Sequence, residues 1–220
     1  MSKKRTYSPA RIGMMLAGIL LIGMCVASYR MSGFGVDPFS CMNLGISGFL
    51  GMSFGTWQLI VNAVLLVIVW FTVRNCIGAG TIVNMVFVGY TADFLCWVCL
   101  DQIGLTVTMP LRIFLLALGT LFASLGCAFY MVAEMGIAPY DSVAFIVTKY
   151  TREKVSFRMA RVLSDLIVMG IGVGFCLMAK NSVWEIVGLG TVVNACCNGP
   201  LIQFFRGRIE KVWASGTGNV

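Results

Sequence analysis

The chain of 220 residues is 59% hydrophobic and 11% charged, with a mean hydropathy of +0.90. A soluble domain has roughly 45 to 50% apolar and 25% charged residues, so this composition indicates a protein of the lipid bilayer. The net charge of +7 comes from basic residues clustered beside the apolar runs, which favours topology signals and contact with anionic lipids and argues against nucleic-acid binding.

Six apolar runs are each long enough to cross about 30 Å of hydrocarbon as a helix. None alternates strictly between apolar and polar residues, which argues against an outer-membrane barrel. We therefore expect an all-α polytopic membrane protein with about six transmembrane helices and two short half-helices. The expected spans are residues 12–29, 56–73, 80–100, 111–133, 162–179 and 183–205.

The two expected half-helices are the apolar segments 39–52 and 140–148, which are short for spans. If both crossed the bilayer, the chain would have eight spans. The basic residues do not distinguish the alternatives, because 13 of the 16 lie on the cytoplasmic side in either case. Length favours six spans, with the N-terminal segment 1–10 and the C-terminal tail 207–220 both cytoplasmic.

A repeated order of motifs divides the membrane part into residues 11–101 and 110–206. Each half has a span, then Gly-x-x-Pro-aromatic, then Ser-Phe, then Asn or Asp nine residues after the Ser, and then Gly-Thr with a Phe fourteen residues after the Gly. Four elements in the same order at nearly the same spacing indicate duplication. Since each half has three spans, the second copy would enter the bilayer from the opposite side, which predicts inverted-topology repeats.

The segment GVDPFS predicts a break between two helices, at Gly35 and Pro38. Proline cannot continue a helix from upstream, glycine permits unusual backbone angles, and Asp37 precedes Pro38 as an N-cap precedes the first helical residue. Capping alone explains this carboxylate. The alternative is that a broken helix in the bilayer lines a cavity, as in the sites of secondary transporters.

The segment GIAPYD repeats this pattern, with Gly136 and Pro139 as the predicted helix break. Its carboxylate, Asp141, would lie about two residues into the helix that Pro139 begins, where the positive end of the helix dipole favours it. Capping and a binding role are again both open.

Asp93 and Asp165 lie inside membrane-length runs, where carboxylates usually face the protein interior and have partners. The repeat aligns Asp165 with Asn62 and Asp93 with Gln203. Interhelical hydrogen bonding and an ion or proton site explain these residues equally well.

The repeated Gly-Thr-x-Val-Asn motif contains Asn84 and Asn194. Its small residues favour close helix packing, and the two amides are further candidates for a site between the repeats.

No Walker loop, dinucleotide fingerprint or nucleophile with a histidine base occurs, and the chain has no histidine. The Cys96 and Cys99 pair has no second pair to complete a zinc site. We therefore expect no catalytic residues, no metal and no cofactor.

These motifs resemble the YczE/YyaS/YitT group of bacterial integral membrane proteins, particularly its YczE-like branch. The resemblance is carried by GFGVDPF, GISGFLGMSFGTWQ, GTIVNMVFVGYTADF and MGIAPYDSVAF, and it covers about residues 10–206. It implies a multi-pass protein of the bacterial cytoplasmic (inner) membrane. It implies no particular activity and identifies no site residues.

Two functions fit the sequence. The first is a small secondary transporter or permease for an ion or small molecule, with Asp37, Asp141, Asp93 and Asp165 as binding groups and Asn62, Asn84 and Asn194 as neutral partners. A homodimer is then expected, since a chain of 220 residues is small for enclosing a pathway alone. The second is a non-transporting accessory or scaffold protein that binds a partner through its basic cytoplasmic segments.

Overall fold

The computed structural model describes residues 8–217, and the side chains of residues 8–212. Its regular elements over that range are all helical, and six helices are long and apolar enough to cross a membrane. The prediction of an all-α membrane protein with six spans and two shorter helices is therefore confirmed. The long helices are α1 (Pro9–Ser32), α3 (Phe54–Thr72), α4 (Ala79–Cys96), α5 (Met109–Ala133), α7 (Phe157–Met178) and α8 (Leu189–Thr217).

The short elements stand between the long helices. The helix α2 (Pro38–Leu50) follows α1, and α6 (Ser142–Tyr150) follows α5. A π-helical turn, η2 (Trp97–Gln102), extends α4, and two 3-10 turns precede α4 and α8: η1 (Arg74–Cys76) and η3 (Val183–Glu185).

Three helix boundaries differ from the predicted ones by five residues or more. The helix α7 begins at Phe157 and not at residue 162, because the Ser156 side chain caps it by accepting a hydrogen bond from the Met159 N–H (3.3 Å). The helix α8 begins at Leu189 and not at residue 183, after the 3-10 turn η3. It then continues to Thr217, beyond the predicted end of the span at residue 205.

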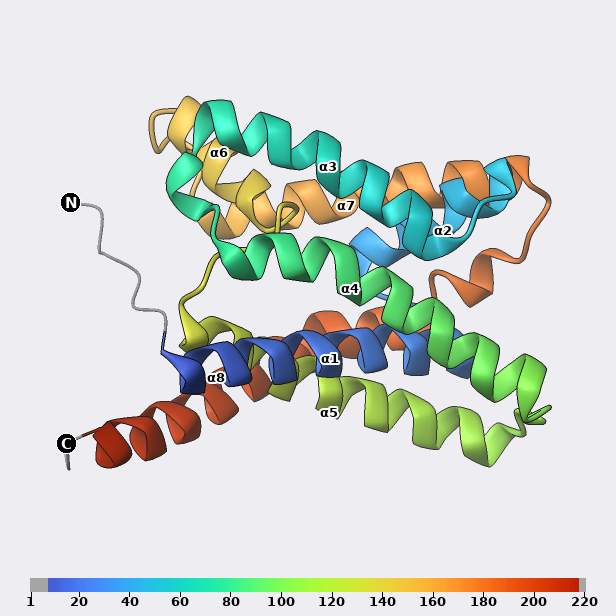
Figure 1. The fold of residues 1–220 in the computed structure, drawn as a ribbon. Coiled ribbons are helices and arrows are strands. Elements are labelled where there is room, and N and C mark those ends of the chain that lie inside the picture. Colours follow the sequence, from blue (N-terminus) through green and yellow to red (C-terminus); the bar gives the residue numbers. More distant parts are fainter. Residues whose placement is uncertain (1–7, 218–220) are drawn as a thin grey trace.

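The helices form two groups (Figure 1). In the first, α1 packs along α5, and α4 and α8 flank this pair; in the second, α2 packs along α7, which also contacts α6. The contact of α3 with α4 joins the two groups. The backbones of α1 and α5 approach each other closely where Gly18 meets Gly126. A Cβ atom on Gly18 would lie only 2.8 Å from the Gly126 carbonyl oxygen. Small residues at such crossings are typical of membrane helices.

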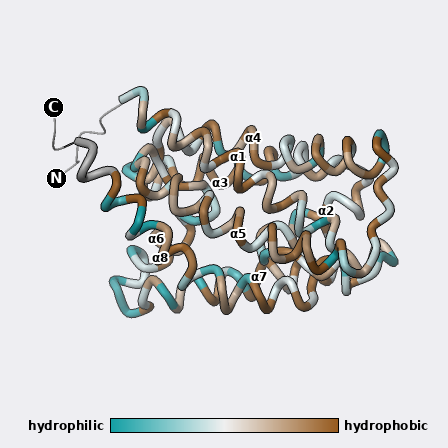
Figure 2. The backbone as a smooth tube through the Cα atoms, turned by 90° about the horizontal axis from the view of Figure 1, so that it is seen from below, coloured by the Kyte–Doolittle hydropathy of each residue, from teal (hydrophilic) through white to brown (hydrophobic). Residues whose placement is uncertain are grey.

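Hydrophobic residues run along the lengths of the helices (Figure 2), and many large hydrophobic side chains are exposed on the outside of the molecule. An apolar exterior of this extent is what lipid contact requires. The start of α1, the turn between α6 and α7 and the end of α8 lie at one end of the molecule, and the connection from α4 to α5 lies at the other (Figure 1). The orientation of these ends in a membrane, and the inverted relation of the repeats, remain predictions.

Candidate functional site

The first helix break separates α1 from α2. Gly35 adopts φ +95°, a conformation that L side chains rarely reach. The Asp37 carboxylate then accepts a hydrogen bond from the Ser40 N–H (3.0 Å), so it caps α2, whose first residue is Pro38. Sequence and structure agree on this local arrangement.

The second helix break has a different local structure. Gly136 adopts φ +134°, but Pro139 does not begin a helix. Residues 139–141 form a turn, in which the Ser142 N–H donates to the Ala138 carbonyl oxygen (3.2 Å), and α6 starts at Ser142. The expected position of Asp141 inside a helix begun by Pro139 is therefore wrong. Its side chain makes no capping hydrogen bond.

The two breaks are each held by the Gly-Thr motif of the other half. At the second break, the Gly80 N–H donates to the Met135 carbonyl oxygen (2.9 Å), and the Thr81 hydroxyl donates to that of Ile137 (2.8 Å). This places the start of α4 directly against Gly136.

The first break has the matching contacts. The Gly190 N–H donates to the Phe34 carbonyl oxygen (2.6 Å), and the Thr191 hydroxyl donates to that of Val36 (2.9 Å). We call these two sets of contacts the exchanged joints. They satisfy backbone groups that a broken helix leaves unpaired, so the Gly-Thr motifs have a structural role beyond close packing.

A charged cluster lies where the half-helices begin. The Arg161 guanidinium, one turn into α7, pairs with the Asp141 carboxylate and with that of Asp165 (3.3 Å). The Tyr140 hydroxyl donates a 2.6 Å hydrogen bond to Asp165. Two structural units, α7 and the turn before α6, are thereby joined through ionised groups.

Two aromatic rings connect this cluster to the first break. The Phe39 ring, in the first turn of α2, stacks on that of Tyr140 with a centroid distance of 4.4 Å and an angle of 14° between the planes. The Arg161 guanidinium lies over the other ring of the pair, 4.9 Å from the Tyr140 centroid. The starts of both half-helices therefore meet, although Phe39 and Tyr140 are about a hundred residues apart in the chain.

Asp37 belongs electrostatically to the same cluster. It lies in the loop between α1 and α2, outside the six long helices. Burial raises the pKa of its carboxyl, whereas the hydrogen bonds from Ser40 and the charge of Arg161 lower it and the charge of Asp165 raises it again. We define the charged cluster as Asp37, Tyr140, Asp141, Arg161 and Asp165.

Asp93 lies apart from the charged cluster. Its carboxylate accepts hydrogen bonds from the Arg30 guanidinium (2.6 Å) and from the Gly55 N–H (2.6 Å). The expectation that this acid has a partner in the bilayer holds, but its contacts join α1, α3 and α4 and not the two half-helices.

The three amides proposed as neutral partners also lie outside the charged cluster, as far as the described contacts go. Asn62 is buried on α3 and Asn84 is buried on α4. The Asn194 side-chain Oδ1 accepts a hydrogen bond from the Asn198 side-chain amide (3.3 Å), and the Asn198 Oδ1 accepts one from the Ser124 hydroxyl (2.9 Å). Within the described residues, no three His, Cys, Asp or Glu side chains form a group that could hold a metal ion.

Sequence reasoning missed Arg161 and Tyr140. Arg161 was assigned to the basic topology signal, and Tyr140 entered only as the aromatic position of a motif. The available signal was the spacing of Arg161 and Asp165, because residues four apart on a helix lie on one face.

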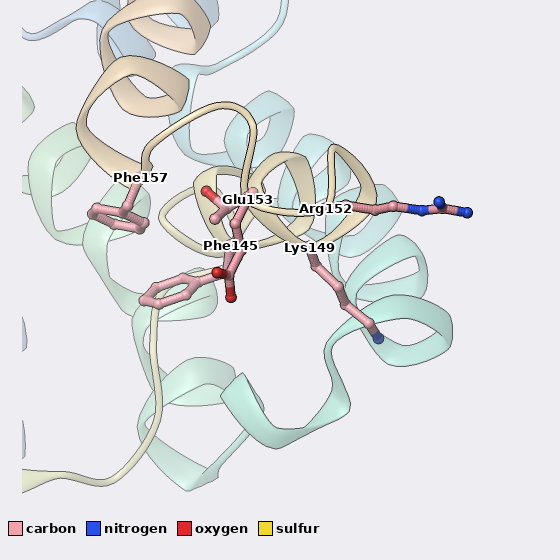
Figure 3. A pocket seen from close by; sticks show the side chains of 6 residues that line it. Phe145, Lys149, Arg152, Glu153 and Phe157 are labelled. Carbon is pink, nitrogen blue, oxygen red and sulfur yellow. The ribbon is translucent and has the colours of Figure 1, made fainter.

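A second surface lies at the turn between α6 and α7. It is an open cleft of about 600 Å³ lined by Phe145, Thr148, Lys149, Arg152, Glu153 and Phe157. Figure 3 shows Arg152 extending away from the turn, whereas Phe145 and Phe157 lie on its other side. The Lys149 ammonium donates to the Thr72 carbonyl oxygen (2.6 Å) and so ties α6 to the end of α3.

Comparison with known sequences gives a match over residues 9–207 to the family described as "Family of unknown function (DUF6198)". The chain belongs to this family. It is also 22% identical to the uncharacterized protein YyaS of Bacillus subtilis, over 90% of this chain and 93% of the relative. The uncharacterized membrane protein YczE of the same organism is 22% identical, over 86% and 81% of the two chains.

An uncharacterized protein of Haemophilus influenzae is 26% identical, over 91% of this chain and 85% of the relative. No solved structure matches the chain significantly. The resemblance to the YczE and YyaS group is therefore confirmed over nearly the whole chain, and a relative described as a membrane protein agrees with the six apolar helices.

Proposed function

We propose that the protein is a small secondary transporter and that the charged cluster is its substrate or ion site. One observation carries the proposal: two interrupted helices begin beside each other, at the Phe39 and Tyr140 rings, next to ionised groups of α7. Discontinuous helices that meet near ionisable side chains are the usual construction of a transporter site.

The partial exposure of the cluster supports a binding role over a purely structural one. The side chains of Arg161, Asp141 and Asp165 are 36%, 46% and 26% exposed, on a chain whose long helices expose many large hydrophobic side chains. Ionisable groups within membrane spans are costly, at roughly 2.5 to 3.5 kcal/mol each on insertion scales, and usually mark an ion or substrate path. Capping does not account for Asp141 or Asp165, since neither carboxylate caps a helix.

The charges of the cluster favour a cation as the ligand. Arg161 pairs with two carboxylates, those of Asp141 and Asp165, and acts electrostatically on Asp37 as well, so negative charge is in excess when all the groups are ionised. A proton, a monovalent metal ion or a protonated amine would reduce the repulsion among the carboxylates. Binding would then stabilise one arrangement of the two halves over another, which is the requirement for alternating access.

The test uses purified protein in detergent and in liposomes. Thermal stability is measured against protons, sodium, potassium and small amines, because a ligand at a hundred times its dissociation constant adds about 2.7 kcal/mol. We expect a stabilising cation whose effect is lost in Asp165→Asn and kept in Asp101→Asn, a control in the exposed turn η2. Flux of that cation into liposomes should follow the same pattern. Equal responses of both variants to every cation would contradict the proposed site.

A second candidate function rests on the cleft at the α6–α7 turn. An accessory protein would bind its partner through Lys149 and Arg152, which lie beside exposed aromatic side chains. Neutralising both residues would then abolish function and leave any cation response unchanged. The transporter proposal predicts instead that the Lys149→Gln/Arg152→Gln double variant keeps its function as well as its cation response, so this variant separates the two functions. We also propose that the protein lies in the bacterial inner membrane, with both ends of the chain in the cytoplasm.

A further inference from the structure

The two halves of the molecule pack differently at equivalent places. In the first half α3 packs along α4, whereas α7 and α8, their counterparts in the repeat, share no extended packing. A Cβ atom on Gly89 would lie 2.8 Å from the Gly55 Cα atom, but one on Gly199, which the repeat aligns with Gly89, would have nothing within 4 Å. The helices α3 and α4 are therefore in close contact, whereas α7 and α8 are separated.

This difference decides which polar side chains are accessible. The repeat aligns Gln58 with Arg161 and Asn62 with Asp165. Gln58 and Asn62 are 5% and 2% exposed, whereas the charged cluster is partly exposed. The polar pair of the first half is therefore buried, whereas the equivalent pair of the second half is partly exposed.

Hydrogen bonds to one carboxylate connect α1, α3 and α4. The Asp93 carboxylate of α4 accepts one hydrogen bond from Arg30 of α1 and one from the Gly55 N–H of α3, each 2.6 Å long. Arg30 also lies over the Phe54 ring, 4.9 Å from its centroid. Both oxygens of the carboxylate are used, so separating α3 from α4 requires a charge-assisted hydrogen bond to break.

A cleft of about 520 Å³ reaches these contacts from the end of the molecule where α1 ends. Its lining includes Arg30, Phe54, Asp93, Cys96 and Asp101. One wall is the π-helical turn η2, and such irregular turns in α-helices frequently occur at functional sites.

We propose that the Arg30, Asp93 and Gly55 contacts form a gate that closes the transport path on the side of this cleft, while the path is open between α7 and α8. The inference rests on the proposed transport function and assigns Asp93 to gating and not to substrate binding. When the gate opens, α4 moves away from α3, and this pair then resembles α7 and α8, which are already separated. Asp93 then gives up the Gly55 N–H, and the cleft deepens towards the charged cluster.

A native cysteine reports on this opening. Cys96 lines the cleft, is 8% exposed, and its thiol contacts the Ala27 carbonyl oxygen at 3.9 Å. Alkylation of the full-length protein by N-ethylmaleimide, followed residue by residue with mass spectrometry, measures how often this thiol is uncovered. Cys176, which is 2% exposed in the other hydrophobic core, reports general unfolding in the same experiment.

The Asp93→Asn variant should increase the alkylation rate of Cys96 roughly tenfold, the factor that corresponds to the loss of one charge-assisted hydrogen bond. Cys176 should be unaffected. Asp101→Asn removes another carboxylate that acts on the Cys96 thiol, so it controls for the change of charge and should raise the Cys96 rate much less than Asp93→Asn does; an equal increase in the two variants overturns the gate. An unchanged Cys96 rate in Asp93→Asn overturns the gate, and so does a parallel increase at Cys96 and Cys176. If Asp93→Asn does not fold, Arg30→Gln provides the same comparison.

The alkylation assay requires neither substrate nor transport, so it separates the two proposals. Selective exposure of Cys96 in a protein without cation flux would overturn the transport function and leave the contacts as a structural latch. Cation flux in the wild type with no effect of Asp93→Asn on Cys96 would overturn the gate alone.

Discussion

The exchanged joints give the most direct test of the fold on which the site depends. Alanine at Gly136 would face two obstacles. Its φ of +134° belongs to a region that only glycine adopts readily, and its Cβ atom would lie 2.5 Å from the Thr81 hydroxyl oxygen and 3.0 Å from the Gly78 nitrogen. The expected decrease in the free energy of unfolding therefore has two parts, strain in the backbone at residue 136 and displacement of the joint.

The magnitude follows from these two parts. A strained backbone of this kind costs of order 1 to 3 kcal/mol. Displacing the joint puts at risk the hydrogen bonds from Gly80, Thr81 and Ile137, each worth about 0.5 to 1.5 kcal/mol net. We expect Gly136→Ala to lower the free energy of unfolding by about 3 to 5 kcal/mol.

Two matched controls separate the contributions. Gly51 has φ +67° with nothing within 4 Å of a Cβ atom, so Gly51→Ala carries only the backbone cost, about 1 to 2 kcal/mol. Gly170, inside α7, has open space as well, without a positive φ, so Gly170→Ala should be neutral or stabilising by up to about 1 kcal/mol. Thermal unfolding in one detergent ranks the three variants. If Gly136→Ala is no less stable than Gly51→Ala, the joint does not hold the second break and the reasoning fails.

Three further predictions concern the joints and the charged cluster. Thr191→Val removes the hydroxyl that donates to Val36 and accepts from the Gly188 N–H, and it should cost about 1 to 3 kcal/mol in thermal unfolding, with Thr56→Val on the exposed start of α3 as control. Tyr140→Phe keeps the stacked ring but removes the 2.6 Å hydrogen bond that positions Asp165, so cation stabilisation should weaken while the fold is retained; unchanged cation stabilisation would contradict this. Because burial raises the pKa of Asp37, its contribution to stability is fully present below the ordinary aspartate pKa and is lost as the pH rises through the raised value. Asp37→Asn should abolish that part of the pH dependence, and an identical slope in wild type and variant would refute it.

The long helices follow from the sequence because their length and hydropathy are local properties. The helix start at Phe157 was within reach of the same reasoning, since Ser156 is a good N-cap residue. The start of α8 was not. Its position depends on the Gly190 N–H reaching the Phe34 carbonyl oxygen, a contact between residues far apart in the chain.

The candidate site was predicted in part for a similar reason. Asp37, Asp141 and Asp165 were selected as carboxylates near breaks or inside spans, and the structure brings these three to one place. Asp93 satisfied the same criterion and lies elsewhere, because its position is determined by Arg30 and Gly55. A sequence criterion for polar groups in a membrane detects the cost of burial but not the partner that offsets it.

The exchanged joints are alike in the two halves, but the chemistry beside them is not. At the positions where the second half has Arg161 and Asp165, the first half has the amides Gln58 and Asn62. The difference agrees with the packing, because these amides are buried and α3 packs against α4. A neutral amide tolerates burial when it is hydrogen-bonded, whereas an ionised carboxylate at the same place would require a paired charge or a shifted pKa.

The placement of Arg161 and Asp165 in the second half, with amides at the equivalent positions of the first, has a consequence for the proposed mechanism. If both halves carried charged clusters, closing either side would bury ionised groups, and each closed state would carry a large desolvation cost. With amides in the first half, closing α3 against α4 buries only neutral side chains, and the gate ion pair at Asp93 stays at the cleft. Closing the α7 side, by contrast, would bury the charged cluster. A bound cation that neutralises the excess negative charge of the cluster lowers this desolvation cost. Closure on the α7 side therefore depends on the ligand, whereas closure of α3 against α4 does not.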